Sequence, residues 1–434
     1  MCSNHLFHTK VLLFWINHLF DIKILPSLLQ DTFIIVLSVA LTYFTSIGVS
    51  AQVSTVFNVM DFGAKGDGKS DDSTAVLNAW CAACSSNAAS PILVIPSQRT
   101  FLLYPTMAFN GPCKSPKIGI AILGTLLAPP PSAWNGYSTD NWLTFRYVDG
   151  LTINGNGVIN GGGPTWWNKL CKTNNVEGCI QRAPMSLSML SCNNIRLEDL
   201  HFVDSAFFHT HFWNCKTATF RRLTFRAPYE SPDTVGIHLS ACQNMRLHNL
   251  TIGTGDDCVA IDDKTSNVYI SKTVCGPGHG ISIGSLGKNG ESAAVEDIYV
   301  RSVIFIGTSN GARIKTWQGG KGYVKNITYS RMSFVEVKNP ITIDQYYCGG
   351  GSGCNTQADA VKISDVRFIG GSGTSTGHSA PISLMCSETV PCTDLVVRGV
   401  KITPATHSGE SKAECVNAHG LSIGEVVPQV PCLK

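Results

Sequence analysis

The chain has 434 residues, of which 44% are hydrophobic and 15% charged, and its formal net charge is +3. Such a chain can bury a large core, and its low charge and 41 glycines favour β structure with many turns over helical bundles. The basic residues form no continuous block, which argues against a nucleic-acid-binding protein.

An apolar segment near the N-terminus predicts export. Residues 33–49 are almost all apolar, and the small residues Val49-Ser50-Ala51 follow before Gln52, as at a signal-peptide cleavage site. A membrane anchor is the alternative, but a run of roughly 17 residues with several hydroxyl side chains is marginal for crossing a bilayer. We therefore expect residues 1–51 to be an N-terminal extension plus secretory signal. Residues 52–434 would form one extracellular or cell-wall domain, monomeric and without stable membrane association.

Cysteine usage agrees with export. Only Cys2 of the 17 cysteines precedes Gln52, so 16 remain, and an even, high number predicts disulfides formed in an oxidising compartment. The candidate bridges are Cys84–Cys113, Cys258–Cys275, Cys348–Cys354, Cys386–Cys392 and Cys415–Cys432. Zinc binding is the alternative, but the sequence contains neither paired CxxC motifs nor a histidine cluster at ligand spacing. Asn249-Leu250-Thr251 and Asn326-Ile327-Thr328 are predicted glycosylation sites.

An internal repeat determines the expected fold. The pattern is apolar-x-apolar-x-x-apolar-x-apolar, with copies roughly 23 to 34 residues apart, as in solenoid proteins. Copies begin at Ile195, Ala218, Met245, Ile298, Ile327, Val361 and Leu395, and weaker ones at Leu151 and Val268. Alternation in each half predicts strands, and the two-residue interruption predicts a bend.

One strand–bend–strand unit cannot bury its apolar side, but stacked units can. We therefore predict an all-β, single-domain, right-handed parallel β-helix. A sandwich or propeller would require hairpin turns that are largely missing. Residues 71–85 carry Ala75, Val76, Ala79, Trp80 and Ala83 at helical spacing and predict an N-terminal capping helix.

Two adjacent carboxylates in the stretch Thr254–Ile261 predict the functional site. Since neighbouring rungs of such a stack lie about 4.8 Å apart, polar residues one repeat apart become neighbours. The residues so placed on one strip are Asp256, Asp257, His279, Arg313, Lys315 and Tyr347. Two carboxylates beside several cations suit an anionic substrate, and a structural ladder of salt bridges is the alternative.

The residues around these positions resemble those of a known family. Gly255-Asp256-Asp257, Gly278-His279-Gly280, Arg313-Ile314-Lys315 and Ser231-Pro232-Asp233-Thr234 are similar to the four motifs of polygalacturonases, the pectin-hydrolysing glycoside hydrolases. Cys275-Gly276-Pro277, directly before Gly278, also resembles the family's sequence. Phe57-Asn58-Val59 resembles the mature N-terminus of the family. The resemblance covers roughly residues 55–434, is greatest to the plant enzymes, and implies a right-handed parallel β-helix.

The resemblance also implies a reaction and residue roles. Members hydrolyse α-1,4 bonds between galacturonic acid units of pectin with inversion, and they use neither metal nor cofactor. By motif, Asp256 is the general acid, Asp257 one of two carboxylates that activate water, and His279 a supporting histidine. Arg313, Lys315 and Tyr347 would bind the substrate.

One departure from the family affects the chemistry. The family motif reads Asn-Thr-Asp, whereas this chain has Asp233-Thr234-Val235, so the second water-activating carboxylate is replaced by an apolar side chain. We expect reduced activity, with Asp233 as a nearby residue that contacts substrate or partly replaces the missing group. Asp204 and Phe207 also replace a usual Asn and Gln, and Asp262 lies where glycines are common.

Two alternatives remain at this point. One is a catalytically inactive β-helix that binds pectin through Arg313, Lys315 and His279. The other is a calcium-dependent pectate lyase on the same fold, which needs a carboxylate cluster for the metal and a base for proton abstraction.

Overall fold

The computed structural model describes residues 55–434 except 174–176, 350–353 and 407–410. The predicted leader, residues 1–51, and the predicted mature start at Gln52 lie outside the described residues. Among the residues described, no helix is long and apolar enough to cross a membrane.

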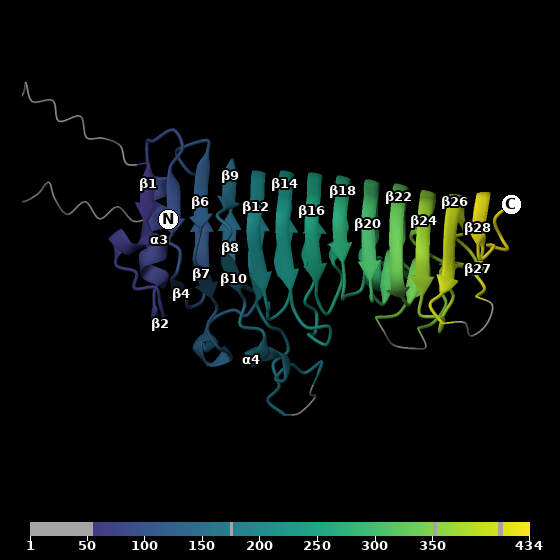
Figure 1. The fold of residues 1–434 in the computed structure, drawn as a ribbon, viewed down its shortest axis with the longest axis horizontal. Coiled ribbons are helices and arrows are strands. Elements are labelled where there is room, and N and C mark those ends of the chain that lie inside the picture. Colours follow the sequence, from purple (N-terminus) through teal and green to yellow (C-terminus); the bar gives the residue numbers. More distant parts are fainter. Residues whose placement is uncertain (1–54, 174–176, 350–353, 407–410) are drawn as a thin grey trace, which may run out of the picture. The chain divides into compact units, whose positions relative to one another are not determined.

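The strands stack in parallel, rung upon rung, in the order of the sequence (Figure 1). Their ladders form two sheets, and most rungs add a strand to each. The 17-stranded sheet consists of β1 (Val56–Asn58), β2 (Asp67–Asp71), β3 (Ile92–Ile95), β4 (Thr100–Leu102), β6 (Ile118–Ile122), β7 (Thr125–Leu127), β9 (Leu151–Asn154), β10 (Val158–Asn160), β12 (Asn193–Val203), β14 (Lys216–Arg226), β16 (Gln243–Gly253), β18 (Ser266–Cys275), β20 (Ser292–Ile306), β22 (Lys321–Val337), β24 (Lys362–Ser375), β26 (Cys392–Pro404) and β28 (Ala418–Val427).

The 11-stranded sheet carries the residues of the predicted site. It consists of β5 (Met107–Asn110), β8 (Asn141–Arg146), β11 (Met185–Leu190), β13 (Thr210–Trp213), β15 (Ile237–Ser240), β17 (Val259–Ile261), β19 (Ile281–Leu286), β21 (Asn310–Trp317), β23 (Asn339–Tyr347), β25 (Ile382–Met385) and β27 (Glu414–Val416). The predicted all-β parallel β-helix is confirmed.

The predicted bend is present in the repeated units. Each long strand of the larger sheet turns at a residue with left-handed backbone, for example Asp199 (φ 53°), Arg222 (φ 51°) and Lys272 (φ 52°). These residues occupy the two-residue interruption between the apolar pairs. The apolar residues on both sides of the bend therefore point to the same interior, and Phe202 stacks on Phe225 of the next rung at 4.7 Å.

Side chains of the 11-stranded sheet alternate between the core and an outer face. Phe212, Leu239 and Ile261 belong to one buried row of the core. The neighbouring positions form an outer row that consists of His211, His238, Ala260, Ser282 and Arg313. Each fully buried apolar side chain contributes about 1.5–3 kcal/mol to folding, so the register of this sheet is strongly determined.

A helix, α3 (Ser73–Cys84), occupies the predicted N-terminal segment and packs against β1, β3 and β5. All five apolar residues that predicted it are buried. Asp72 precedes it, but its carboxylate accepts hydrogen bonds from the N–H groups of Lys65 and Gly66 rather than from the helix. Its role in closing the end of the stack stays a prediction. The other short helical segments are α4 (Pro164–Trp167), η1 (Val59–Phe62), η2 (Pro131–Trp134) and η3 (Lys288–Gly290).

The five predicted disulfides are present, and Cys171–Cys179 is a sixth that the sequence did not predict. Cys192, Cys215 and Cys242, which belong to none of the candidate bridges, are free and buried. They precede β12, β14 and β16 at equivalent positions, and the thiols donate to backbone carbonyls. Such thiols pack as small core side chains.

Candidate active site

A glycine turn presents the two carboxylates between β16 and β17. A side chain at Gly255 would place its Cβ 1.9 Å from the carbonyl oxygen of Ser231, so only glycine fits. Thr234 Oγ1 accepts a hydrogen bond from the Gly255 N–H at 2.9 Å, and the Ser231 and Thr234 hydroxyls are 2.6 Å apart. The segment Ser231–Thr234 therefore supports the turn from the preceding rung.

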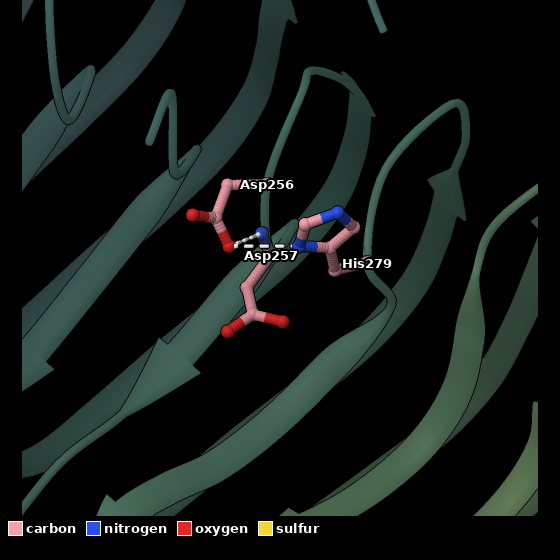
Figure 2. Close-up of side chains that lie close together, drawn as sticks. All are labelled: Asp256, Asp257 and His279. Atoms are coloured by element: carbon pink, nitrogen blue, oxygen red, sulfur yellow. Dashed lines mark hydrogen bonds and ion pairs between the residues drawn. The ribbon is translucent and has the colours of Figure 1, made fainter. Parts of the chain in front are cut away.

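His279 approaches Asp256 from the next rung, as Figure 2 shows. Its Nδ1 lies 3.1 Å from Asp256 Oδ1, which also accepts the N–H of Asp257 at 2.6 Å. The Cys258–Cys275 disulfide joins the residue that follows Asp257 to the last residue of β18, which precedes Gly278. At Gly278 (φ 149°) a Cβ would lie 2.7 Å from the Asp256 carbonyl oxygen, so a larger residue would push the two turns apart.

The environment of Asp256 favours its ionised form. Burial alone would raise the pKa of Asp256, but the hydrogen bond and charge of His279, the charge of Lys315 and the N–H of Asp257 outweigh burial and lower it to about 2. The Asp256 side chain is 18% exposed. In the free site Asp256 is therefore ionised, with His279 Nδ1 at hydrogen-bond distance from its carboxylate.

Asp257 is held by two side chains from following rungs. Lys315 Nζ of β21 lies 2.8 Å from Asp257 Oδ2, and Ser282 Oγ of β19 donates to Oδ1 at 2.6 Å. The Lys315 and Asp257 side chains are only 10% and 3% exposed. Their charges therefore compensate each other in a largely dry environment. Lys315 was predicted to contact substrate, and in the structure its ammonium is bound to Asp257.

Arg313 and Tyr347 lie together on neighbouring strands, as predicted. The Arg313 guanidinium carbon is 5.5 Å from the centroid of the Tyr347 ring, and Trp317 meets that ring edge to face at 5.4 Å. Lys315 Nζ lies 5.6 Å from the same centroid. Arg313 Nε is buried without a hydrogen-bond partner among the described residues. The guanidinium therefore retains a free donor beside an aromatic ring, an arrangement that suits a carboxylate ligand.

Val235 occupies the position equivalent to Asp257 in the preceding rung. The Gly236 N–H donates to the Asp257 carbonyl, and the His279 N–H donates to the Asp256 carbonyl, which sets the three rungs in register. Val235 is 3% exposed but does not belong to the interior cluster of apolar side chains. Asp233, two residues earlier, is paired with Lys172 at 2.5 Å.

Asp256, Asp257 and His279 also form a donor set that could hold a metal ion, with one ligand atom from each within 4.8 Å of the others. Lys315 argues against a cation there, because its ammonium already neutralises Asp257 and would repel a divalent ion.

Ser282 and His238 adjoin the site and were not among the predicted residues. Ser282 follows His279 by three residues and lies in the outer row beside Ala260, so its rung position could have indicated it. The ring of His238 in β15 stacks on that of Phe208, in the loop before β13, at 4.8 Å. The spacing of the repeat does not predict this contact.

The outer face of this parallel β-helix thus presents two adjacent carboxylates, one beside His279 and one paired with Lys315. The chain belongs to family 28 of the glycosyl hydrolases, whose family model matches residues 84–424. We therefore identify it as a glycoside hydrolase of the polygalacturonase family.

Named relatives agree with this assignment. The chain is 43% identical over 390 residues to a probable polygalacturonase of Arabidopsis thaliana. The alignment covers 88% of this chain and 82% of the relative. It is 39% identical over 382 residues to a polygalacturonase of Chamaecyparis obtusa, in an alignment that covers 87% of this chain and 72% of the relative.

Solved structures share the fold at low sequence identity. An endo-xylogalacturonan hydrolase from Aspergillus tubingensis superposes with a TM-score of 0.71 at 21% identity, covering 86% of this chain and 99% of that one. An exopolygalacturonase from Thermotoga maritima gives 0.65 at 19% identity, covering 85% and 92%.

Proposed function

We propose that this protein is a secreted hydrolase of the α-1,4-galacturonosyl bonds of pectin, which acts with inversion and at a reduced rate. The observation that carries the proposal is the buried Asp256–Asp257 pair, with His279 on the first carboxylate and Lys315 on the second. The polygalacturonase relatives supply the substrate class, a pectic polysaccharide.

Asp256 is the proposed general acid, and it receives its proton from His279. The free carboxyl has a pKa of about 2 and is ionised, so it cannot donate a proton before substrate binds. A bound galacturonan excludes water and brings negative charge, and both effects raise the pKa of a carboxyl group. The proton then moves from His279 Nδ1 across 3.1 Å to Asp256 Oδ1 and on to the leaving oxygen.

Asp257 is the proposed water-activating group, and its geometry supports slow turnover. Asp257 uses one oxygen for Ser282 and the other for Lys315. A second carboxylate at position 235 would hold the water, and Val235 cannot.

Substrate binding is assigned to the cations and the aromatic ring on the β21 and β23 side. Arg313 would bind a galacturonate carboxylate beside Tyr347, while Lys315 acts through Asp257 as well as through its charge. Asp233 would contact substrate only after leaving Lys172.

Incubation with unesterified polygalacturonate tests the proposal. New reducing ends without an unsaturated product identify a hydrolase, and NMR of the first-formed anomer tests inversion. Calcium-dependent unsaturated products identify a pectate lyase, and binding without cleavage identifies an inactive pectin-binding protein. Either result overturns the proposed reaction.

Secretion is part of the proposal. The predicted signal ending at Ala51 supports it, as do the six disulfides between described residues. N-terminal sequencing of exported protein should begin near Gln52, and retention of residues 33–49 in a membrane fraction would contradict it. The exposed Asn249 suits a glycan, whereas the side-chain amide of Asn326 donates to Tyr299 and is partly buried.

A further inference from the structure

The two sides of the carboxylate pair differ in chemistry. On the β13 and β15 side lies an apolar flank made of Phe207, Phe208 and His238. The Phe207 and Phe208 rings stack at 4.2 Å, and Phe208 stacks on His238 at 4.8 Å. In the outer row His238 lies beside Ala260, and Ala260 lies beside Ser282, whose hydroxyl donates to Asp257, so the apolar flank adjoins the site.

Cations near the apolar flank are already paired with acidic side chains. Lys172 is bound to Asp233 at 2.5 Å, and Arg182, whose guanidinium lies 5.3 Å from the Phe207 ring, is 3.5 Å from Asp140. The carboxylate of Asp262 lies 3.8 Å from His238 Nε2 and is 37% exposed. A free galacturonate carboxylate on this side would therefore have to displace Asp233 or Asp140 from its cation, and it would lie near the rings and the carboxylate of Asp262.

His238 of the flank and the neighbouring His211 add no positive charge at neutral pH. Burial and the charge of Lys315 lower the pKa of His238 to about 4, and burial lowers that of His211 to about 3. The Nδ1 atoms of both rings are buried and without partners among the described residues. The β21 and β23 side, by contrast, offers Arg313 next to Tyr347.

We propose that the apolar flank binds a methyl-esterified galacturonate, while the Arg313 side binds a galacturonate with a free carboxylate. An ester removes the charge that Asp262 would repel and adds a methyl group that Phe207 and Phe208 can cover. The substrate would then be pectin in which esterified and free units adjoin. This inference rests on the proposed function and specifies its substrate.

Binding and cleavage of two polymers test the inference. Affinity and reducing-end release are measured on unesterified polygalacturonate and on the same polymer with randomly placed methyl esters on about half its units. A methyl-sized group in an apolar pocket changes discrimination by about 10–200-fold, so we expect at least about tenfold tighter binding of the esterified polymer. Mass spectrometry of the products should find esters enriched at only one of the two new chain ends.

Single substitutions test whether the preference for the esterified polymer comes from the apolar flank. Phe207→Gln should lose the preference for ester, and Asp262→Asn should strengthen binding of the unesterified polymer several-fold. Tyr269→Gln, an exposed ring on the 17-stranded sheet, is the matched control and should change neither affinity.

The outcomes separate this inference from the proposed reaction. Equal affinity for both polymers, or esters equally frequent at both new ends, overturns the ester-binding flank and leaves the hydrolase proposal standing. A protein that prefers the esterified polymer but releases no reducing ends supports the flank and contradicts the hydrolase.

Discussion

Lys315 Nζ lies 2.8 Å from Asp257 Oδ2, and the two side chains form an ion pair that is almost completely buried. A cation that was expected to contact substrate is thus paired with Asp257, the proposed water-activating carboxylate. We therefore expect variants at position 315 to change both substrate binding and catalysis.

Removing the lysine should cost stability. Loss of one partner from a buried ion pair typically destabilises a protein by about 3–5 kcal/mol, because the other charge stays buried and uncompensated. We expect Lys315→Met to lower the free energy of unfolding in urea by that amount. The double variant Lys315→Met/Asp257→Leu should recover much of the loss. Equal stability of Lys315→Met and the unmodified protein would contradict the buried pair.

Arg313→Ala should weaken binding without unfolding the protein. The guanidinium rests on Tyr347 and has a free Nε, so its removal leaves no buried charge behind. We expect affinity for unesterified polygalacturonate to fall by about tenfold or more, since charge-assisted hydrogen bonds contribute about 1.5–3 kcal/mol. Arg313→Lys should recover part of it. A fully methyl-esterified polymer is the control, and an equal loss on that polymer would argue against carboxylate recognition.

Acid should destabilise the fold below pH 6.5. Burial lowers the pKa of His209 and of His238 to about 4, so both stay neutral in the fold while the unfolded chain binds protons below about 6.5. Stability is therefore complete above pH 6.5 and falls as the pH drops toward 4, by on the order of 3 kcal/mol per histidine.

Urea unfolding at pH 7, 5.5 and 4.5 measures this slope, and His238→Gln should flatten it. The pKa of Asp256, lowered to about 2, acts in a separate window: its stabilising effect is present above the ordinary pKa of 3.8 and is lost as the pH falls toward 2. An identical slope in the variant would show that His238 is not a buried neutral group.

Cys192, Cys215 and Cys242 should be unreactive in the fold. Burial raises the pKa of Cys192 to about 12, and all three side chains are buried. A thiol reagent followed by peptide mass spectrometry should leave these three unmodified in native protein and label them in denaturant. Labelling under native conditions would show that the core opens at these rungs.

The repeat made the fold and the grouping of the site predictable. Period-two apolar alternation with a two-residue interruption has one bending point, and residues such as Asp199 and Lys272 adopt left-handed backbone there. The same spacing brought Asp256, Asp257 and His279 together, because residues one rung apart must be neighbours.

Side-chain partnerships were less predictable. Rung spacing says which residues share a face, but it does not say whether Lys315 turns to Asp257 or to solvent. The free thiols were not predicted either, because the number of cysteines does not show which of them form disulfides and which pack as free thiols in the core. The contact between Phe208 and His238 depends on how a loop enters β13, and the sequence pattern contains no signal for it.

The Val235→Asp variant tests the central claim, that the site lacks one of two water-holding carboxylates. Position 235 is equivalent to Asp257 in the adjacent rung, so we expect an added carboxylate to lie beside Asp257. The restored group would act on water and mainly in the transition state, so kcat should rise while KM changes little.

Initial rates of reducing-end release from unesterified polygalacturonate decide this point, measured for the unmodified chain, Val235→Asp and the matched control Val235→Asn, each with its thermal midpoint. We predict that kcat of Val235→Asp rises by about 10²-fold, the lower end of what one acid or base group contributes, while Val235→Asn stays at the level of the unmodified chain. A folded Val235→Asp protein with unchanged kcat would contradict the account.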